Sequence, residues 1–437
     1  MSEFTYPPTL EIVPLSSPPS ATVTVPGSKS ITNRALVLAA LAKTDEACEL
    51  RGVLRSEDTE VMLACLKQLG FRVREDWATN TVHIVNMEPR RIPATSADLF
   101  VANSGTTMRF LAAMVSLGSG RYRLDGVPRM RERPVEDLLA VLRELGVSAT
   151  TETGNGCPPV VIESQGLQTG DVRIRADKSS QFLSALLMAA PFARPTHRTA
   201  ATTIYLDGPL VSEPYVEMTL RMLEWWHIRV ERPFPDVYRI EPQGGYRDSY
   251  SIEPDASAAS YFWAAAAICG GRVTVSGLNR KSLQGDVAFM DVLERMGCRV
   301  EECDSGITVH GRPLKGIDVD MNAISDTVMT LGAVALFADG PTTIRNVGHI
   351  RHKETDRIAA VATELRKLGA EVEERADGLT ITPRPLRGCA VDTYNDHRMA
   401  MSLALVGLKV PGVVVRDPGC VAKTYPGFWR DLDGLRK

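Results

Sequence analysis

The sequence lacks the features that mark membrane and secreted proteins. No apolar run in its 437 residues reaches the roughly 18 residues that a membrane-spanning helix needs. The N-terminus has neither the basic segment nor the apolar core of a secretory signal. We therefore expect a cytoplasmic protein with no membrane partner.

Metal-binding and nucleotide-binding motifs are missing as well. The eight cysteines form no CxxC pair and no Cys/His cluster with the spacing of a zinc site. The GxxxxGK[ST] loop of nucleotide hydrolases and the GxGxxG motif of dinucleotide-binding folds are both absent. We therefore expect no metal ion, no cofactor and reduced, structural thiols.

An excess of positive charge is also absent. The 50 Lys and Arg residues face 53 Asp and Glu residues, which gives a formal net charge of −3. Nucleic-acid partners usually need a basic excess, so none is expected. The hydrophobic share of 44% is ordinary for a globular protein, and any binding of anions must come from local clusters of Lys and Arg.

One sequence pattern, an amphipathic helix followed by a strand-like run, occurs five times. The copies are Glu60–Val73, Val135–Ala149, Val216–Val230, Phe289–Glu302 and Ala360–Glu374. Four of them end the helix at a glycine, which adopts the left-handed cap that other residues resist; these are Gly70, Gly146, Gly297 and Gly369. The third copy has Trp226-His227 instead, and we expect its helix to end differently.

A second pattern, small polar residues followed by an apolar helix, occurs six times at intervals of 70 to 77 residues. The copies start at Ser28, Asn103, Asp177, Pro254, Ile324 and Tyr394. Two helices and several strands per repeat predict an α/β fold of six units, three in each of two similar lobes. With a crossover near Tyr250–Asp255, the predicted lobes are residues 28–253 and residues 1–27 plus 254–437.

The starts of these six helices bear on function. Ser, Thr, Asp and Asn are preferred at helix N-caps. Free N–H groups and the positive end of the dipole attract anions there. Six such helices can form a site for a multiply anionic molecule, although each can equally be a capped core helix.

Basic residues gather beside several of these helix starts. Lys29 and Arg34 flank the first one, and three arginines fall within the segment PRMRERP at 128–134. Lys353, Glu354 and Arg357 combine both signs of charge in RHKETDR. Further candidates are Asp326, His397, Arg398 and Lys423. Such a set suits a small, multiply charged anion whose reaction needs proton transfer.

These motifs resemble those of the 5-enolpyruvylshikimate-3-phosphate synthase family. The similar segments are GSKSITNRALVLAALA, NSGTTMRFLAA, GVPRMRERP, KSSQFLSALLMAAP, RHKETDRIAAVATELRKLGAEVEE, YNDHRMAMSLALVGL and CVAKTYPGFW, in order from residue 26 to residue 429. The resemblance implies an inside-out α/β barrel in each lobe, built from three βαβαββ-type units, with the active site in the interdomain cleft. It also implies a monomer.

The resemblance implies two small-molecule substrates, shikimate 3-phosphate and phosphoenolpyruvate. The implied contacts of shikimate 3-phosphate are Lys29, Ser30, Arg34, Ser179, Ser180, Gln181, Ser212, Tyr215, Asp326 and Lys353. Those of phosphoenolpyruvate are Lys29, Asn103, Gly105, Thr106, Arg133, Gln181, Arg357, Arg398 and Lys423. The first lobe would hold the acceptor, and the second would supply most of the phosphoenolpyruvate clamp.

The implied reaction is an addition followed by an elimination, at the sixth step of the shikimate pathway to chorismate and aromatic amino acids. Asp326 is the candidate base for the 5-hydroxyl of shikimate 3-phosphate, and Glu354 is the candidate acid for the methylene carbon. The cations would stabilise the tetrahedral intermediate. Lys29 would assist the departure of phosphate.

Some positions depart from the family pattern. Ser104, Thr107 and Phe110 differ from the commoner NAGTAMRPL, and His349-Ile350 replace a frequent Asn-Trp. The family is the target of glyphosate, which occupies the phosphoenolpyruvate subsite. The retained Gly105 favours sensitivity to the inhibitor, whereas Thr107 and Phe110 favour weaker binding.

Three alternatives remain open. The sister enzyme that uses UDP-N-acetylglucosamine shares the fold, but it carries Lys-Asn near its N-terminus and a catalytic Cys in a loop. Here Ser30 follows the Lys, and the segment 128–134 has no Cys. A non-catalytic anion-binding relative would have lost Lys29, Asp326 or Glu354. The RNA 3′-phosphate cyclase class would need a more basic surface.

Overall fold

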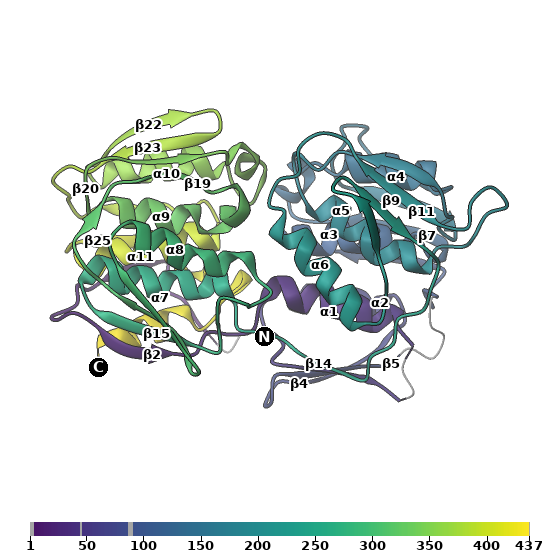
Figure 1. The fold of residues 1–437 in the computed structure, drawn as a ribbon, viewed down its shortest axis with the longest axis horizontal. Helices are drawn as coiled ribbons and strands as arrows, with labels where there is room; N and C mark the ends of the chain where they lie inside the picture. The colour runs from purple at the N-terminus through teal and green to yellow at the C-terminus, as the bar shows by residue number, and fades with distance from the viewer. Residues whose placement is uncertain (1–3, 44–45, 86–90, 437) are drawn as a thin grey trace. The chain divides into compact units, whose positions relative to one another are not determined.

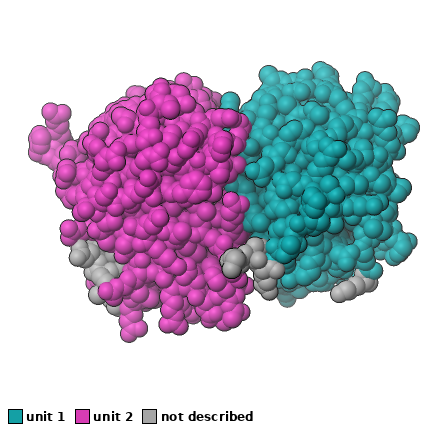
Figure 2. Space-filling view, turned by 180° about the vertical axis from the view of Figure 1, so that it is seen from behind, with its two compact units in different colours: residues 1–26, 253–437 teal, residues 27–252 magenta. Residues whose placement is uncertain are grey.

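The computed structural model describes residues 4–43, 46–85 and 91–436, and it divides the chain into two compact units (Figures 1 and 2). One unit is formed by residues 27–252, and the other by residues 1–26 together with 253–437.

The unit of residues 27–252 contains three four-stranded sheets with the same topology. In sheet order they are β14 (Ser249–Ser251), β3 (Cys48–Arg51), β5 (Thr81–Val85) and β4 (Arg72–Asp76); then β6 (Ser96–Phe100), β7 (Ser119–Asp125), β9 (Val160–Gln165) and β8 (Ser148–Thr151); then β10 (Asp171–Ile174), β11 (Thr202–Leu206), β13 (Val237–Ile240) and β12 (Glu231–Phe234). In each, the first two strands are parallel and the other pairs are antiparallel.

Two helices accompany each of these sheets. They are α1 (Lys29–Leu41) and α2 (Glu57–Gln68), α3 (Gly105–Val115) and α4 (Glu136–Glu144), and α5 (Gln181–Ala189) and α6 (Pro214–Trp225). The chain order around the second sheet, β6-α3-β7-α4-β8-β9, is the expected βαβαββ unit. In the first sheet the opening strand is β14, which comes from the far end of the unit.

The other unit has the same plan, except that its third sheet has three strands and that two of its sheets include a strand from the N-terminal segment. Its sheets are β2 (Ser20–Val23), β15 (Arg272–Ser276), β17 (Gly306–His310) and β16 (Arg299–Cys303); β19 (Asp318–Asp320), β21 (Thr342–Arg345), β23 (Gly378–Thr382) and β22 (Glu371–Arg375); and β24 (Ala390–Val391), β25 (Val413–Arg416) and β1 (Thr9–Ile12). The N-terminal segment thus contributes β2 and β1 to two different sheets. A short parallel pair joins β18 (Leu314–Lys315) to β20 (Ala338–Asp339).

The helices of this unit are α7 (Ala256–Cys269), α8 (Phe289–Arg295), α9 (Val328–Ala335), α10 (Arg357–Lys367), α11 (His397–Gly407) and α12 (Phe428–Asp433). Every residue of α9 and of α11 is buried, and so are residues 256–268 of α7. These three helices pack on one another at the centre, as α3 packs on α1 and α5 in the first unit. The sheets cover them, which gives the expected arrangement of helices inside and strands outside (Figure 1).

Four helix ends confirm the prediction that a glycine forms the left-handed cap. The end of α6 corrects the prediction that the third copy of the pattern ends differently. Gly70, Gly146, Gly297 and Gly369 have φ angles of 90°, 86°, 115° and 112°. Helix α6 ends in the same way, because His227 also adopts a left-handed φ of 57°. The His227 N–H bonds to Glu224 and the Ile228 N–H to Leu223, the pattern that Gly70 and Phe71 make after α2. The prediction of a different ending was wrong, because the hydrogen bonds impose the left-handed turn on whichever residue stands there.

We expect His227→Gly to raise the free energy of unfolding by about 1 kcal/mol, because glycine removes the cost of a left-handed backbone. The exposed imidazole loses little packing. Urea unfolding measures the change. Gly70→Ala is the matched control and should destabilise the protein, since its Cβ would lie 2.9 Å from the Pro93 Cβ. A less stable His227→Gly variant would contradict this account.

Candidate active site

The unit of residues 1–26 and 253–437 contains a carboxylate held by three cations. Asp326 lies in a short 3-10 helix, η4 (Asn322–Thr327). Its Oδ1 accepts from Lys353 Nζ at 2.5 Å and from Arg357 Nη1 at 3.0 Å, and its Oδ2 accepts from Arg398 Nη2 at 2.8 Å. The structure brings these four sequence-predicted residues into direct contact, and their chemical roles stay predictions.

Arg357, the first residue of α10, is the most deeply buried member of this cluster. Its side chain is 1% exposed. Besides Asp326, it contacts Glu354 through Nη2 at 2.9 Å and Asp396 through Nε at 2.8 Å. Three carboxylates therefore surround one guanidinium that has almost no access to water, and removing any of them would leave buried charge less well compensated.

Asp396 was not singled out from the sequence, although it organises this part of the site. It is the N-cap of α11 and accepts from the Arg398 N–H at 2.9 Å. The two residues before it, Tyr394 and Asn395, both have left-handed φ angles, 56° and 52°. Tyr394 is anchored by its hydroxyl, which donates to the buried Glu364 at 2.6 Å. An Asp directly before an apolar helix is a capping signal that could have identified it.

The charges around Asp326 fix its protonation. Arg398, Lys353 and Arg357 hold the pKa of Asp326 well below its ordinary value despite the burial of the carboxyl. Burial lowers the pKa of Lys353, partly offset by Asp326. Asp326 is therefore ionised at neutral pH, and it becomes a stronger base only if its cations are drawn to another anion.

The remaining predicted residues of this unit are also mostly buried. Lys423 closes the 3-10 helix η6 (Pro418–Lys423) and is 5% exposed. His397 begins α11 and is 1% exposed. His349, one of the departures from the family pattern, has a pKa lowered to about 3 by burial and by the charge of Lys353. His349 is therefore neutral at physiological pH.

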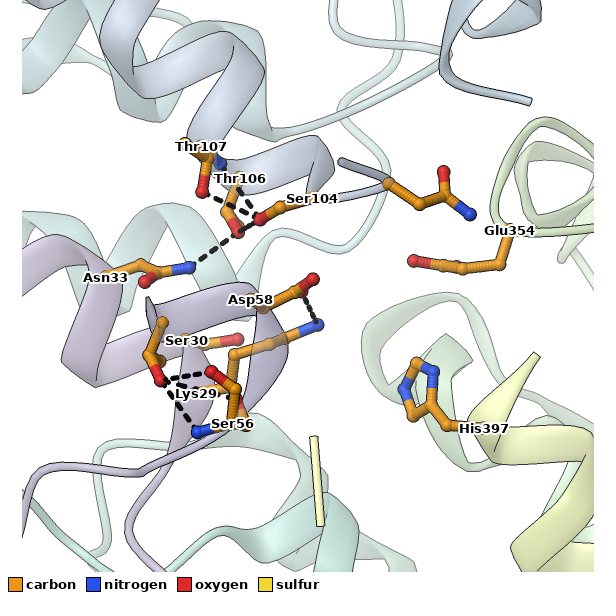
Figure 3. A network of polar contacts seen from close by, with 12 residues as sticks. Lys29, Ser30, Asn33, Ser56, Asp58, Ser104, Thr106, Thr107, Glu354 and His397 are labelled. Atoms are coloured by element: carbon orange, nitrogen blue, oxygen red, sulfur yellow. Dashed lines mark hydrogen bonds and ion pairs between the residues drawn. The ribbon is translucent and has the colours of Figure 1, made fainter. Parts of the chain in front are cut away.

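In the unit of residues 27–252, Lys29 and Ser30 begin α1. Lys29 Nζ lies 3.3 Å from a carboxylate oxygen of Asp58, which is buried in the first turn of α2 (Figure 3). The carboxylate restrains the ammonium at the start of the helix. Asp58 was also missed by sequence reasoning, because 29 positions separate the two residues and no motif links them.

Arg34 lies deeper, with 1% of its surface exposed. Its guanidinium donates to Thr219 Oγ1 at 2.8 Å, to the Ser30 carbonyl at 3.0 Å and to the Tyr215 carbonyl at 3.0 Å. Burial lowers the pKa of Arg34 to about 10, so the group stays charged. Arg34 therefore ties α1 to α6 through Thr219 and Tyr215, while its predicted contact with a substrate stays a prediction.

Gly105 begins α3 beside two buried arginines. A Cβ at this position would lie 2.5 Å from Arg133 Nη2 and 2.8 Å from Arg109 Nη1. Arg133 donates to the Asn103 carbonyl at 2.9 Å, and Arg109 donates to Gln181 Oε1 at 2.7 Å. The absence of a side chain at residue 105 thus lets both guanidinium groups approach the helix start.

The other predicted residues of this unit lie at neighbouring helix starts. Thr106 accepts from Asn33 Nδ2 at 2.8 Å, which links α3 to α1 (Figure 3). Ser179 accepts from the Gln181 N–H at 3.3 Å before α5, where Ser180 is the N-cap. Ser212 and Tyr215 precede and begin α6, and Ser212 has a left-handed φ of 52°.

The three departures near Gly105 are explained by local contacts. The hydroxyl groups of Ser104 and Thr107 lie 2.8 Å apart, so the two changes form one hydrogen-bonded pair at the cap of α3 (Figure 3). The ring of Phe110 is buried, and its centroid lies 5.2 Å from Cζ of Arg34. The aromatic residue therefore supports the charge of Arg34 by a cation–π contact.

Two of the six helix starts are capped by carboxylates of the protein itself. Asp255 accepts from the Ala258 N–H at 2.8 Å at the start of α7, and Asp396 caps α11. These carboxylates already satisfy backbone donors at the two starts. The two starts therefore match the alternative of a capped core helix.

Among residues 4–43, 46–85 and 91–436, no group of three or more His, Cys, Asp or Glu residues could hold a metal ion. In the same part of the chain, no helix combines the length and the apolar character needed to cross a membrane.

The repeated α/β units and buried cations such as Arg34, Arg357 and Arg398 are those of an enzyme class that acts on small, multiply anionic substrates. A family model described as EPSP synthase (3-phosphoshikimate 1-carboxyvinyltransferase) matches residues 15–432. The chain belongs to this family.

Individual relatives agree with this assignment. The 3-phosphoshikimate 1-carboxyvinyltransferase of Nostoc punctiforme is 49% identical over 427 residues, covering 96% of this chain and 97% of that protein. The enzyme of the same name from Aeromonas salmonicida is 46% identical, covering 94% of this chain and 95% of the relative. An EPSP synthase structure from Acinetobacter baumannii has a TM-score of 0.80 at 25% identity and covers 98% of both chains.

We expect Gly105→Ala to weaken the binding of phosphoenolpyruvate at least about tenfold, because the new methyl group displaces the Arg133 guanidinium. The KM for phosphoenolpyruvate measures the effect. Gly434→Ala is the matched control, since no atom lies within 4 Å of its added Cβ. An unchanged KM in Gly105→Ala would show that Arg133 does not depend on the missing side chain.

Proposed function

We propose that this chain transfers the enolpyruvyl group of phosphoenolpyruvate to the 5-hydroxyl of shikimate 3-phosphate and releases inorganic phosphate. The observation that carries the proposal is the buried cluster of Asp326, Lys353, Arg357 and Arg398, with Glu354 against Arg357. It combines cations for anionic substrates with two carboxyl groups for proton transfer. The proposal requires the residues of both units to act on the same pair of substrates.

Binding prepares the site for reaction. Phosphoenolpyruvate brings a carboxylate and a phosphate, which compete with Asp326 for Arg357 and Arg398. As these cations turn to the substrate, the pKa of Asp326 rises, and the carboxylate can accept the proton of the acceptor hydroxyl.

The addition step forms the new C–O bond. The acceptor oxygen attacks C2 of phosphoenolpyruvate while Glu354 delivers a proton to the C3 methylene, which becomes a methyl group. The resulting tetrahedral intermediate carries the phosphate and the carboxylate on one carbon. Arg133 and Lys423, together with the two arginines above, stabilise this concentration of negative charge.

In the elimination, the Glu354 carboxylate takes a proton back from the methyl group, the C=C bond reforms, and the C–O bond to phosphate breaks. The proton held by Asp326 passes to the departing phosphate, so both carboxylates are restored. Lys29 neutralises the departing phosphate, and Asp58 holds its ammonium in place. The protein supplies every proton carrier in this scheme. A monomeric, cytoplasmic enzyme remains our expectation.

The acceptor is tested directly by phosphate release from phosphoenolpyruvate in the presence of a chelator. We expect release with shikimate 3-phosphate and none with UDP-N-acetylglucosamine. Release with the nucleotide sugar would favour the sister enzyme, and no release with either acceptor would favour a non-catalytic relative. A requirement for added metal would contradict the proposed chemistry.

The acid and base roles are tested by Glu354→Gln and Asp326→Asn. We expect kcat to fall by about 10²- to 10⁴-fold in each, because a positioned proton carrier contributes about that factor. Glu373→Gln, an exposed carboxylate paired with Arg375, is the control and should keep full activity. The scheme is wrong if both variants turn over at the wild-type rate.

A further inference from the structure

A fourth carboxylate, Asp286, lies behind the cluster just described. It belongs to the 3-10 helix η3 (Gly285–Ala288) and is 3% exposed. The hydroxyl of Ser257, in the first turn of α7, is hydrogen-bonded to Asp286 Oδ2. Neither Asp286 nor Ser257 has a part in the proposed reaction.

Ser257 connects Asp286 to the site. Arg398 Nη2 donates to Ser257 Oγ at 3.3 Å, and the same Nη2 donates to Asp326 Oδ2 at 2.8 Å. Because the Ser257 hydroxyl donates its hydrogen bond to the Asp286 carboxylate, the lone pairs of Ser257 Oγ face the guanidinium of Arg398. The direction of the Ser257 hydroxyl is therefore set by Asp286, and the placement of Arg398 follows from it.

The segment that carries Asp286 is itself rigidly held. Gln284 Oε1 accepts from the Ala256 N–H at 2.9 Å, and Gln284 Nε2 donates to the Pro254 carbonyl at 2.7 Å. Gln284, the N-cap of η3, and Asp286, within η3, thus attach this segment to the start of α7 at two points. A residue that positions a charged side chain such as that of Arg398 must itself be held in place, and these two attachments hold Asp286.

We propose that Asp286 is a positioning residue, which acts through Ser257 to hold Arg398 in the orientation that serves both Asp326 and the anionic substrate. This inference rests on the proposed function, because it assigns a support to the clamp of that reaction. It adds a structural connection between η3 and α11 that no sequence motif indicates.

The protonation of Asp286 provides a second way to test its role. Burial and the negative charge of Asp326 raise the pKa of Asp286 to about 6, while Arg398 opposes the shift. The charge of Asp255, at the cap of α7, also raises the pKa of Asp286. Protonation near pH 6 removes the negative charge that orients the Ser257 hydroxyl, so we expect the support to weaken below that pH.

A double-mutant cycle tests the connection in the full chain. We expect Asp286→Ala and Ser257→Ala each to lower kcat/KM for phosphoenolpyruvate about tenfold, the effect of one lost hydrogen bond. The double variant should lose little more than either single one, since both changes break the same connection. Losses that multiply to about a hundredfold would overturn the proposal.

Two further variants separate positioning from general damage. Asp286→Asn keeps an acceptor for Ser257 and should lose less activity than Asp286→Ala; equal losses would contradict the proposed role. Asp291→Asn changes an exposed carboxylate paired with Arg280 and should leave kcat/KM at the wild-type value. Thermal unfolding of each variant identifies losses that come from instability.

The pH profile completes the test. Substrate phosphates also titrate near pH 6, so the informative quantity is the ratio of wild-type to Asp286→Asn activity at each pH. We expect this ratio to decline as the pH falls from 7.5 to 5.5, and a constant ratio would count against the proposal. Failure of the wild type to release phosphate would instead refute the proposed function, so the two failures are distinguishable.

Discussion

The structure depends above all on compensating the charge of Arg357 where water cannot reach it. One guanidinium with 1% exposure is balanced by Asp326, Glu354 and Asp396, which come from three separate segments. Removing one partner of such a buried pair costs about 3–5 kcal/mol, so the segments are held in a fixed relation. The start of α10, the cap of α11 and the 3-10 helix η4 are positioned by the same requirement.

The same constraint explains how a nearly neutral protein can bind several anions. Lys353, Arg357 and Arg398 are paired with carboxylates of the protein itself, so their positive charges are compensated. In the proposed mechanism, anionic substrates draw Arg357 and Arg398 away from Asp326, and the weak base becomes a stronger one. Substrate binding and activation of the base would then be one event, with no prior change in the net charge of the protein.

The sequence predicted the repeat well because each unit depends on local signals. Periodic apolar residues, capping residues and terminal glycines all act within a few positions, and they predict repeated units of two helices and several strands. The βαβαββ order was implied by the family resemblance. Predictions failed where tertiary contacts decide. His227 takes the left-handed turn expected of glycine, and the partner of Arg357, Asp396, lies 39 positions away. Asp58 and Asp286 were missed for the same reason, since a sequence does not show which carboxylate meets a cation.

The proposed mechanism requires that anionic substrates release Asp326 from its cations and raise its pKa. Carbon-13 NMR titration of the carboxyl groups measures this, with the Asp326 signal assigned by its loss in Asp326→Asn. We expect the free protein to show no titration of Asp326 between pH 4.5 and 8, because its pKa lies well below the ordinary value. With both substrates bound, a titration step should appear within that range. An Asp326 signal that is unaffected by the substrates at every pH would contradict the account.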